Sequence, residues 1–424
     1  MLSFLIKKTM NTKEKLRQLH KSVQKKPVTK FVNNPVDYER TALELGGEVI
    51  NLENGRFIRI IKKQKLSENY GTIKLNGVEK IPGATITILS KKKVDGHFSF
   101  HSALFIDTET TGLSGGSGTY AFLVGLGYFS DQHFVVEQLF MPGLNDEVSV
   151  LSYLENKLAE HSGLVSFNGK SYDIPLLTAR FIQNRIRPSI DLHQNFDVLH
   201  ASRRIWKNDF GDCTLITLEN KLLNLARQGD VPGEEIPQIF MDYLQTNNTK
   251  QLKKVIYHNQ MDIISMAAII QILHQAIKQP EKSRMAVQPQ EKRVAQLFKD
   301  NNEINPAIDR YKILIDSENI SQEDKSDLLF DLGLLYKKTK RFQESEKVWL
   351  RQINEVEFSI RTAIELAKYY EHKEKNFLRA SEFTNRSLDV LKIRQELGAV
   401  INPELHRALF KRRERLLKKI ARTA

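Results

Sequence analysis

Three short stretches of this 424-residue chain place acidic side chains where they could do metal-dependent chemistry. The first is ALFIDTETTGL, in which Asp107 and Glu109 stand two residues apart. Side chains two apart on a β-strand point to the same face, so these two carboxylates can converge at a strand end. Carboxylate oxygens are the ligands that hard divalent cations prefer. On its own this pattern is common on protein surfaces, but two further acids accompany it.

The other two acids stand on predicted helices. In LVSFNGKSYDIPLL a buried strand leads into an Asn-Gly turn, and Asp173 falls in the first turn of a helix. Asp262 lies in YHNQMDIISMAAII, an otherwise apolar face where a lone acid is costly unless it binds a proton, a partner or a metal. His258 precedes Asp262 by one helical turn, so both side chains face one way. We therefore expect His258 to take a proton from a water beside the carboxylates.

The elements that must position these side chains follow an α/β order. A strand at 103–107 and the β-like runs YAFLVGLGYF and HFVVEQLF favour three antiparallel strands. A helix at SVLSYLENKLAEH, a strand at LVSF, a helix over 171–181, a strand at NFDVL and a long helix over 249–278 follow. The order βββαβαβ with later helices predicts an α/β domain over 101–278.

The flanking regions differ from this domain in pattern. Residues 36–100 combine short β-branched runs (FIRIIKK, GTIKL, ATITIL, HFSF) with turn-forming Asn-Gly, Pro-Gly and Asp-Gly pairs, which predicts a small β-rich module. The polar stretch 279–291 predicts a linker. Beyond it, the segments DLGLLY and ELAKYY share an L-x-x-x-Y pattern 34 residues apart. This period resembles the tetratricopeptide repeat over 292–400, with a helical hairpin array of coincidental spacing as the alternative.

Basic charge is concentrated at the two ends of the chain. The net charge is +13, of which residues 1–30 hold +8 and residues 404–424 hold +6, leaving 13 − 8 − 6 = −1 between them. A basic arm over 1–35 and a basic amphipathic helix over 401–424 suit an anionic partner, nucleic acid or an acidic lipid surface, although solvated tails would look the same. A single cysteine, Cys213, excludes an internal disulfide framework and fits a reducing cytoplasm. No stretch reads as a membrane span, so we expect a cytoplasmic protein with no membrane partner.

Asp107, Glu109, Asp173 and Asp262, in that order and with a histidine just before the last, resemble the DEDD exonucleases of the ribonuclease H-like superfamily. IDTETTGL is similar to the first exonuclease motif, FNGKSYDIPLL to the second, and YHNQMD stands for the third. GTYAFLVGLGYF, the DVPGEEIP segment and the repeats make the chain resemble the bacterial YprB-like nucleases in particular. The ribonuclease H-like resemblance spans about 101–278 and implies that fold, joined to an all-α repeat domain.

This resemblance implies two-metal phosphodiester hydrolysis with two Mg²⁺ or Mn²⁺ ions per site. Asp107 is then expected to bridge both ions, Glu109 and Asp173 to complete the ligand sets, and Asp262 to hold the ion that carries the water. His258 is expected to be the base. Family members with a histidine usually space it H-x4-D, whereas here His258 has the x3 spacing and Tyr257 the x4 spacing. We favour His258, because imidazole titrates near neutral pH and a phenol near pH 10.

The same resemblance implies a 3′-to-5′ exonuclease. We expect DNA, in repair or recombination and with single-stranded 3′ ends, as its substrate, and a helicase or other repair protein as a partner of the repeats. An exoribonuclease in RNA processing is the first alternative, since no sequence feature separates deoxyribose from a 2′-hydroxyl. A non-catalytic repeat scaffold is the second. The candidate substrate contacts are Thr110, Asn168, Lys170, Tyr257, Arg203 and Arg204.

Overall fold

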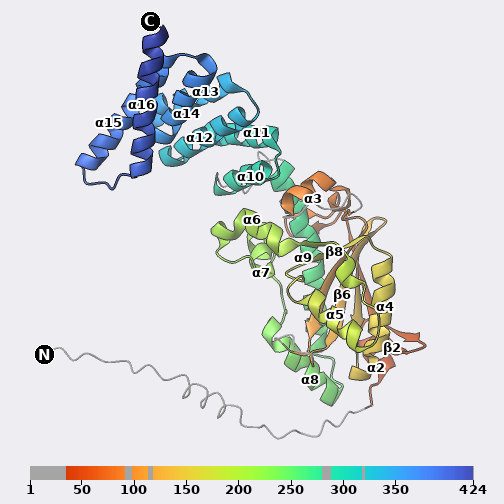
Figure 1. The fold of residues 1–424 in the computed structure, drawn as a ribbon. Coiled ribbons are helices and arrows are strands. Elements are labelled where there is room, and N and C mark those ends of the chain that lie inside the picture. The colour runs from red at the N-terminus through yellow and green to blue at the C-terminus, as the bar shows by residue number, and fades with distance from the viewer. Residues whose placement is uncertain (1–34, 91–97, 113–117, 279–287, 318–319, 424) are drawn as a thin grey trace, which may run out of the picture.

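The computed structural model describes residues 35–90, 98–112, 118–278, 288–317 and 320–423. The predicted basic arm, apart from its last residue, and most of the predicted linker lie outside these residues. A sheet-centred domain, built from the described residues up to Lys278, is followed by an array of helices that extends away from it (Figure 1).

The sheet-centred domain is built on seven strands in the order β1-β2-β7-β6-β5-β8-β9. Its strands are β1 (Glu48–Leu52), β2 (Gly55–Lys65), β5 (Ala103–Thr110), β6 (Ala121–Ser130), β7 (His133–Phe140), β8 (Gly163–Ser166) and β9 (Asn195–Asp197). β5, β6 and β7 pair antiparallel, whereas β8 lies parallel to both β5 and β9. The predicted antiparallel strands followed by alternating helices and strands are confirmed, and this mixed sheet fits a ribonuclease H-like fold.

Helices cover both faces of this sheet, because the central strands are apolar on both sides. The helices are α4 (Glu147–Ala159), α5 (Asp173–Gln183), α6 (Val198–Phe210), α7 (Leu215–Leu218), α8 (Ile236–Thr246) and α9 (Leu252–Lys278). On β5, Leu104 and Ile106 pack in one core with α4 and α5. Phe105 points the other way, into a second core with most of α9. α9 is long and apolar enough to cross a membrane, but 67% of its most apolar window is buried inside the molecule, as in the core helix of a globular domain.

Residues 36–100 do not form the separate β-rich module that the sequence predicts. After α2 (Tyr38–Leu45), the β1–β2 hairpin extends the main sheet, because β2 pairs antiparallel along the whole of β7. This pairing satisfies backbone groups that β7 would otherwise leave at an open edge. Only β3 (Asn69–Tyr70) and β4 (Ile73–Lys74) form a small sheet of their own.

The run ATITIL, expected to be β-like, is part of helix α3 (Gly83–Leu89). Its β-branched composition favours a strand. However, Pro82 caps the helix N-terminus, and Ile86 and Leu89 lie three residues apart on a face that is buried against the core. Tertiary burial along one helical face therefore outweighs the local preference for a strand.

The C-terminal region is entirely helical in its described residues, apart from its connections. Its helices are α10 (Gln288–Asp300), α11 (Ile304–Ile315), α12 (Gln322–Lys338), α13 (Phe342–Arg351), α14 (Ile360–Tyr369), α15 (Phe377–Glu396) and α16 (Pro403–Thr423). Neighbouring helices pack in pairs, α10 with α11, α12 with α13, and α14 with α15. Gly333 on α12 is required by its neighbour, since a Cβ there would lie 2.0 Å from Nε1 of Trp349. Many C-terminal helices are thus confirmed, while the tetratricopeptide class stays a prediction.

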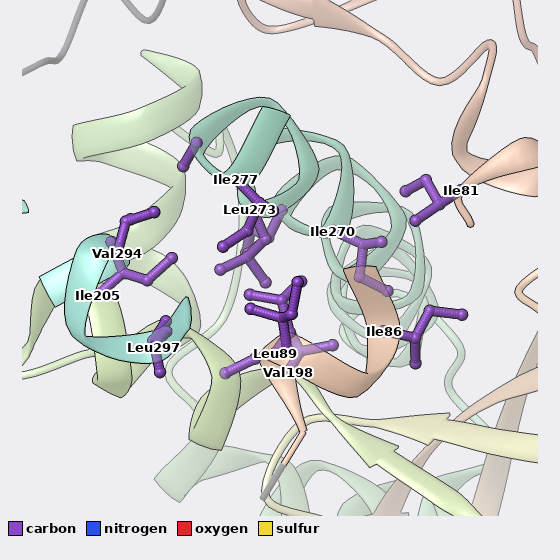
Figure 2. Close-up of a cluster of buried hydrophobic side chains, with 14 of the residues drawn as sticks. Ile81, Ile86, Leu89, Val198, Ile205, Ile270, Leu273, Ile277, Val294 and Leu297 are labelled. Carbon is purple, nitrogen blue, oxygen red and sulfur yellow. The ribbon is translucent and has the colours of Figure 1, made fainter. Parts of the chain in front are cut away.

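The helical array and the sheet-centred domain share one hydrophobic core. α10 packs against α6 and α3, and Figure 2 shows Val294 and Leu297 of α10 beside Ile205, Leu89 and Ile277. The cluster continues through α11 and α12 to Tyr336. The region predicted as a linker therefore lies between two parts that are packed together, and α10 already begins at Gln288.

A buried arginine reinforces this junction. Arg310 on α11 is 6% exposed and its guanidinium hydrogen-bonds the carbonyl oxygens of Ala276 and Ile277 in the last turn of α9. The same side chain pairs with Glu291 of α10. A cation at the C-terminal end of a helix satisfies its free carbonyls and complements its dipole. α11 thus caps the helix that carries two of the candidate catalytic residues.

Candidate active site

β5 brings Asp107 and Glu109 to one edge of the sheet. Side chains alternate along the strand, so Leu104 and Ile106 are buried on one face. Asp107 and Glu109 lie on the other face, where Glu109 is buried and Asp107 is partly exposed. The pairing of β5 with β6 becomes irregular between Glu109 and Thr110, where the strand ends. Both acids therefore stand at the end of a central strand, as the sequence predicts.

A buried amide pair fixes Asp107 from behind. Nδ2 of Asn259 donates a hydrogen bond to Oδ2 of Asp107 at 2.9 Å. Oδ1 of the same Asn259 accepts from Nε2 of Gln138 at 2.9 Å, and both amides are fully buried. Gly125 of β6 leaves the space for this contact, since a Cβ there would lie 2.1 Å from Oδ1 of Asn259. The orientation of Asp107 is thus set by β6, β7 and α9 together.

Asp173 is the first residue of α5, where a carboxylate suits the helix dipole. The Thr108 hydroxyl of β5 donates a hydrogen bond to its Oδ1 at 2.5 Å. Burial raises the pKa of Asp173 to about 6, although the hydrogen bond from Thr108 opposes that shift. The contact joins the start of α5 to the end of β5, so the second acidic motif meets the first.

α9 supplies His258 and Asp262 on one face. Nε2 of His258 lies 3.6 Å from Oδ2 of Asp262, and Nδ1 of His258 lies 2.9 Å from Oδ1 of Asp230. The imidazole is therefore held between two carboxylates. Tyr257, the alternative base by spacing, is partly buried and packs against the hydrophobic core.

Arg227 connects the carboxylates on this side of the site. Its guanidinium forks onto Glu219, with Nε 2.7 Å from Oε2 and an Nη2 contact to Oε1. Nη2 also hydrogen-bonds Oδ1 of Asp262, and Nη1 lies 3.2 Å from Oδ2 of Asp230. The side chain of Arg227 is 4% exposed. Arg227 thus fixes both carboxylates that flank His258.

A buried network anchors Arg227 in turn. Glu219 is fully buried in a π-helical turn and also accepts a hydrogen bond from Ser265 of α9. Tyr70 of β3 completes this hydrogen-bond network, with its hydroxyl oxygen 2.8 Å from Oγ of Ser265. Burial lowers the pKa of Arg227, but the hydrogen bond to Glu219 and the charge of Asp262 outweigh it and raise that pKa. The positive charge of Arg227 is thus shared among Glu219, Asp230 and Asp262.

The acidic residues crowd negative charge at the sheet edge. Burial, and then the charges of Asp262 and Asp173, raise the pKa of Asp107 well above its usual range. Burial and the neighbouring Asp107 do the same for Glu109. A divalent cation would relieve this repulsion, and an all-carboxylate donor set fits Mg²⁺ or Mn²⁺. Across the described ranges, no three His, Cys, Asp or Glu side chains close on a single point as a metal-ligand group. The donor chemistry of these side chains therefore fits a divalent cation.

The candidate substrate contacts are scattered. Thr110 donates to the Gly112 carbonyl at 2.8 Å, beside the acids. Asn168 has a positive φ of 62°, and its N–H donates to Oδ1 of Asp197 at 3.0 Å. Lys170 is exposed near the start of α5.

The two candidate arginines lie on α6, the helix that packs against α10. Arg203 is exposed, whereas Nη1 of Arg204 donates to the Leu89 carbonyl at 2.6 Å. Arg204 thus has a structural partner on α3 at the junction with the array. A phosphate contact by either residue stays a prediction.

Sequence reasoning missed Arg227, Asp230, Glu219 and Asn259. Asn259 follows His258 in YHNQMD, but the sequence does not predict that its side chain points toward Asp107. Arg227 and Asp230 occur in RQGDVPGEE, which has no helical or strand period, and they reach α9 only through the tertiary fold. The resemblance to YprB-like nucleases includes the DVPGEEIP segment, which begins at Asp230, but it assigns no role to this acid.

Comparisons with known proteins agree with this fold. Residues 104–274, which contain all four acids and His258, match the family model of the RNase H superfamily. The chain is also 32% identical over 296 residues to YprB of Bacillus subtilis strain 168, itself an uncharacterized protein. That match covers 69% of this chain and 70% of YprB. The chain therefore belongs to the YprB family, with an RNase H-like domain, and this membership indicates a nuclease.

Proposed function

We propose that this protein is a divalent-metal-dependent 3′-to-5′ exonuclease of the DEDD type, acting on single-stranded 3′ ends of DNA in repair or recombination. The observation that carries the proposal is the convergence of β5, α5 and α9. Asp107, Glu109, Asp173 and Asp262 interact electrostatically at one sheet edge, and His258 stands beside Asp262. The charges of the neighbouring acids help to raise the pKa of Asp107 and Glu109, and a bound cation would relieve this repulsion.

The four carboxylates would hold two Mg²⁺ or Mn²⁺ ions. When bound, such ions neutralise charge on the scissile phosphate and lower the pKa of water. Among this chain's own residues, His258 accepts the proton of the attacking water. Its Nδ1–H donates to Asp230, which leaves the Nε2 lone pair facing the acid cluster. Asp230 orients that imidazole, and Arg227 hydrogen-bonds both Asp230 and Asp262.

The helical array and the cellular context complete the proposal. The repeats are proposed to be tetratricopeptide-like and to dock a helicase or another repair protein in the cytoplasm. RNA remains the alternative substrate, and a non-catalytic scaffold the alternative function. The buried support for His258 and Asp262 favours catalysis, because a scaffold has no need for an oriented base.

A gel assay tests the proposal. Purified protein is incubated with 5′-labelled single-stranded DNA, duplex DNA and matched RNA, in Mg²⁺, Mn²⁺ or EDTA. We expect a metal-dependent ladder that shortens from the 3′ end and is absent for Asp107→Ala. The ratio of DNA to RNA cleavage selects between the two substrates. Intact substrate in every lane would reject catalysis and favour the scaffold.

A further inference from the structure

The last helix, α16, is held in a fixed orientation by one buried acid. Glu371, which is 0% exposed, is paired with three cations of α16: Arg412 at 2.9 Å, Arg415 at 2.7 Å and Lys419 at 2.8 Å. Burial raises the pKa of Glu371, but the hydrogen bonds from Arg415 and Lys419 dominate and lower it to about 2. Leu409 and Leu416 of α16 are also buried against the array. One face of α16 therefore packs against the rest of the helical array.

The opposite face of α16 presents a basic stripe, defined by Arg407, Lys411, Lys418 and Arg422. All four side chains are exposed, and among the described residues none of the four forms an ion pair. Their spacing of four, seven and four residues places them within an arc of roughly 60°, over a length of about 22 Å. Glu414 lies about 20° outside this arc and is paired with Arg413 at 3.8 Å. No acid among the described residues thus lies within ion-pair distance of these four cations.

An exposed aromatic ring accompanies the basic stripe. Phe410 is 44% exposed, and the guanidinium of Arg413 lies 4.5 Å from the centre of its ring. Leu417, about two turns further along, is 50% exposed. Cations that follow a line, next to an aromatic side chain, are the features by which proteins hold single-stranded nucleic acid.

We propose that the basic stripe of α16 binds the phosphate backbone of single-stranded nucleic acid, with Phe410 stacking on a base. This inference rests on the proposed function, in which nucleic acid is the substrate, and it adds a second contact on the far side of the array from the sheet-centred domain (Figure 1). An acidic lipid surface fits less well. A helix that binds a membrane inserts a broad apolar face, whereas Leu409 and Leu416 of α16 already pack inside the protein.

The stripe is connected to the sheet-centred domain through the packing of the helical array. The array is joined to α9 through the shared core and through Arg310, and α16 packs on the array against α15 and Glu371. A strand held by the stripe is therefore kept near the enzyme after its 3′ end is released.

Binding without cleavage tests the inference. A fluorescently labelled 30-nucleotide oligo(dT) is titrated with the full chain in EDTA, over a range of salt concentrations, and followed by anisotropy. The test variant replaces every cation of the basic stripe by glutamine. A matched control removes the same charge from the sheet-centred domain, at the exposed residues Lys62, Lys63, Lys74 and Lys80.

Four lost phosphate contacts should reduce the slope of log affinity against log salt by about 3, since each contact on a single strand contributes roughly 0.7. We expect the stripe variant to bind at least tenfold more weakly at low salt, and the control to stay within twofold of the original protein. Phe410→Ala should weaken binding with little change in the salt slope, because stacking involves no counterions. Both sets of residues are exposed, so equal melting temperatures will verify that folding is intact.

Two results would overturn the inference. One is a stripe variant that matches the lysine control in affinity and salt slope. The other is loss of binding to anionic phospholipid vesicles by the stripe variant while its oligo(dT) affinity stays unchanged, which would assign the stripe to a membrane surface. Failure of the exonuclease proposal is distinguishable, because binding is measured without metal or cleavage. A protein that binds through the stripe but cleaves nothing would keep this inference and refute the catalytic one.

Discussion

Replacing Arg227 separates its structural role from its role in positioning the base. Arg227 is the partner of the fully buried Glu219, so Arg227→Met leaves a carboxylate unpaired in the core. Removing one member of a buried ion pair costs about 3–5 kcal/mol. Adding Glu219→Gln removes that charge while keeping an acceptor for Ser265. We expect the double variant to recover most of the lost free energy of unfolding, measured by urea denaturation.

Activity should not recover with stability. Both variants lack the guanidinium that fixes Asp262 and Asp230, and hence the two carboxylates beside His258. Misplacement of catalytic groups by about 1 Å costs on the order of 100-fold in rate. We therefore expect kcat on a single-stranded substrate to fall about 100-fold in the double variant, with KM changed less than threefold.

Arg227→Lys is the matched control, since it keeps the positive charge but loses the planar fork. It should retain more stability than Arg227→Met while recovering little of the rate. A double variant with the original kcat would refute the reasoning, because Arg227 would then serve only to neutralise the charge of Glu219. A single variant of unchanged stability would refute the assumed cost of the unpaired acid.

Three further predictions follow from neighbouring contacts. Asp107→Asn should raise the free energy of unfolding in EDTA, since it removes one of several repelling charges, and should abolish any rise in melting temperature with Mn²⁺. Gly125→Ala should cost about 1–3 kcal/mol by overpacking against Asn259 and should lower kcat, as measured by urea denaturation and the gel assay. Glu371→Gln should cost about 1–3 kcal/mol at pH 7. Because the folded pKa of Glu371 is lowered to about 2, its contribution is complete above about pH 4.5 and disappears as the pH falls toward 2, which thermal melts across pH will check.

The sequence predicts those parts of the site that depend on local periodicity. β5 with Asp107 and Glu109, and α9 with His258 and Asp262, are visible because alternation and helical spacing fix which side chains share a face. Arg227 gives no such signal, since it lies in an irregular segment and meets Asp262 only after α9 has packed. The same limit explains the error at α3 and the β1–β2 hairpin. Composition reports a local preference, whereas pairing with β7 and burial against α9 are decided by distant parts of the chain.

The shared core changes how the role of the helical array can be tested. A deletion that ended the chain after α9 would expose Leu273 and Ile277, which pack against α10 in the intact protein, and would remove the cap that Arg310 places on α9. Loss of activity after such a deletion would therefore report damage to the helix that carries His258 and Asp262. It would say nothing about a docking partner. Only substitutions on the exposed surface of the array, which leave this core intact, can assign partner or strand binding to the repeats.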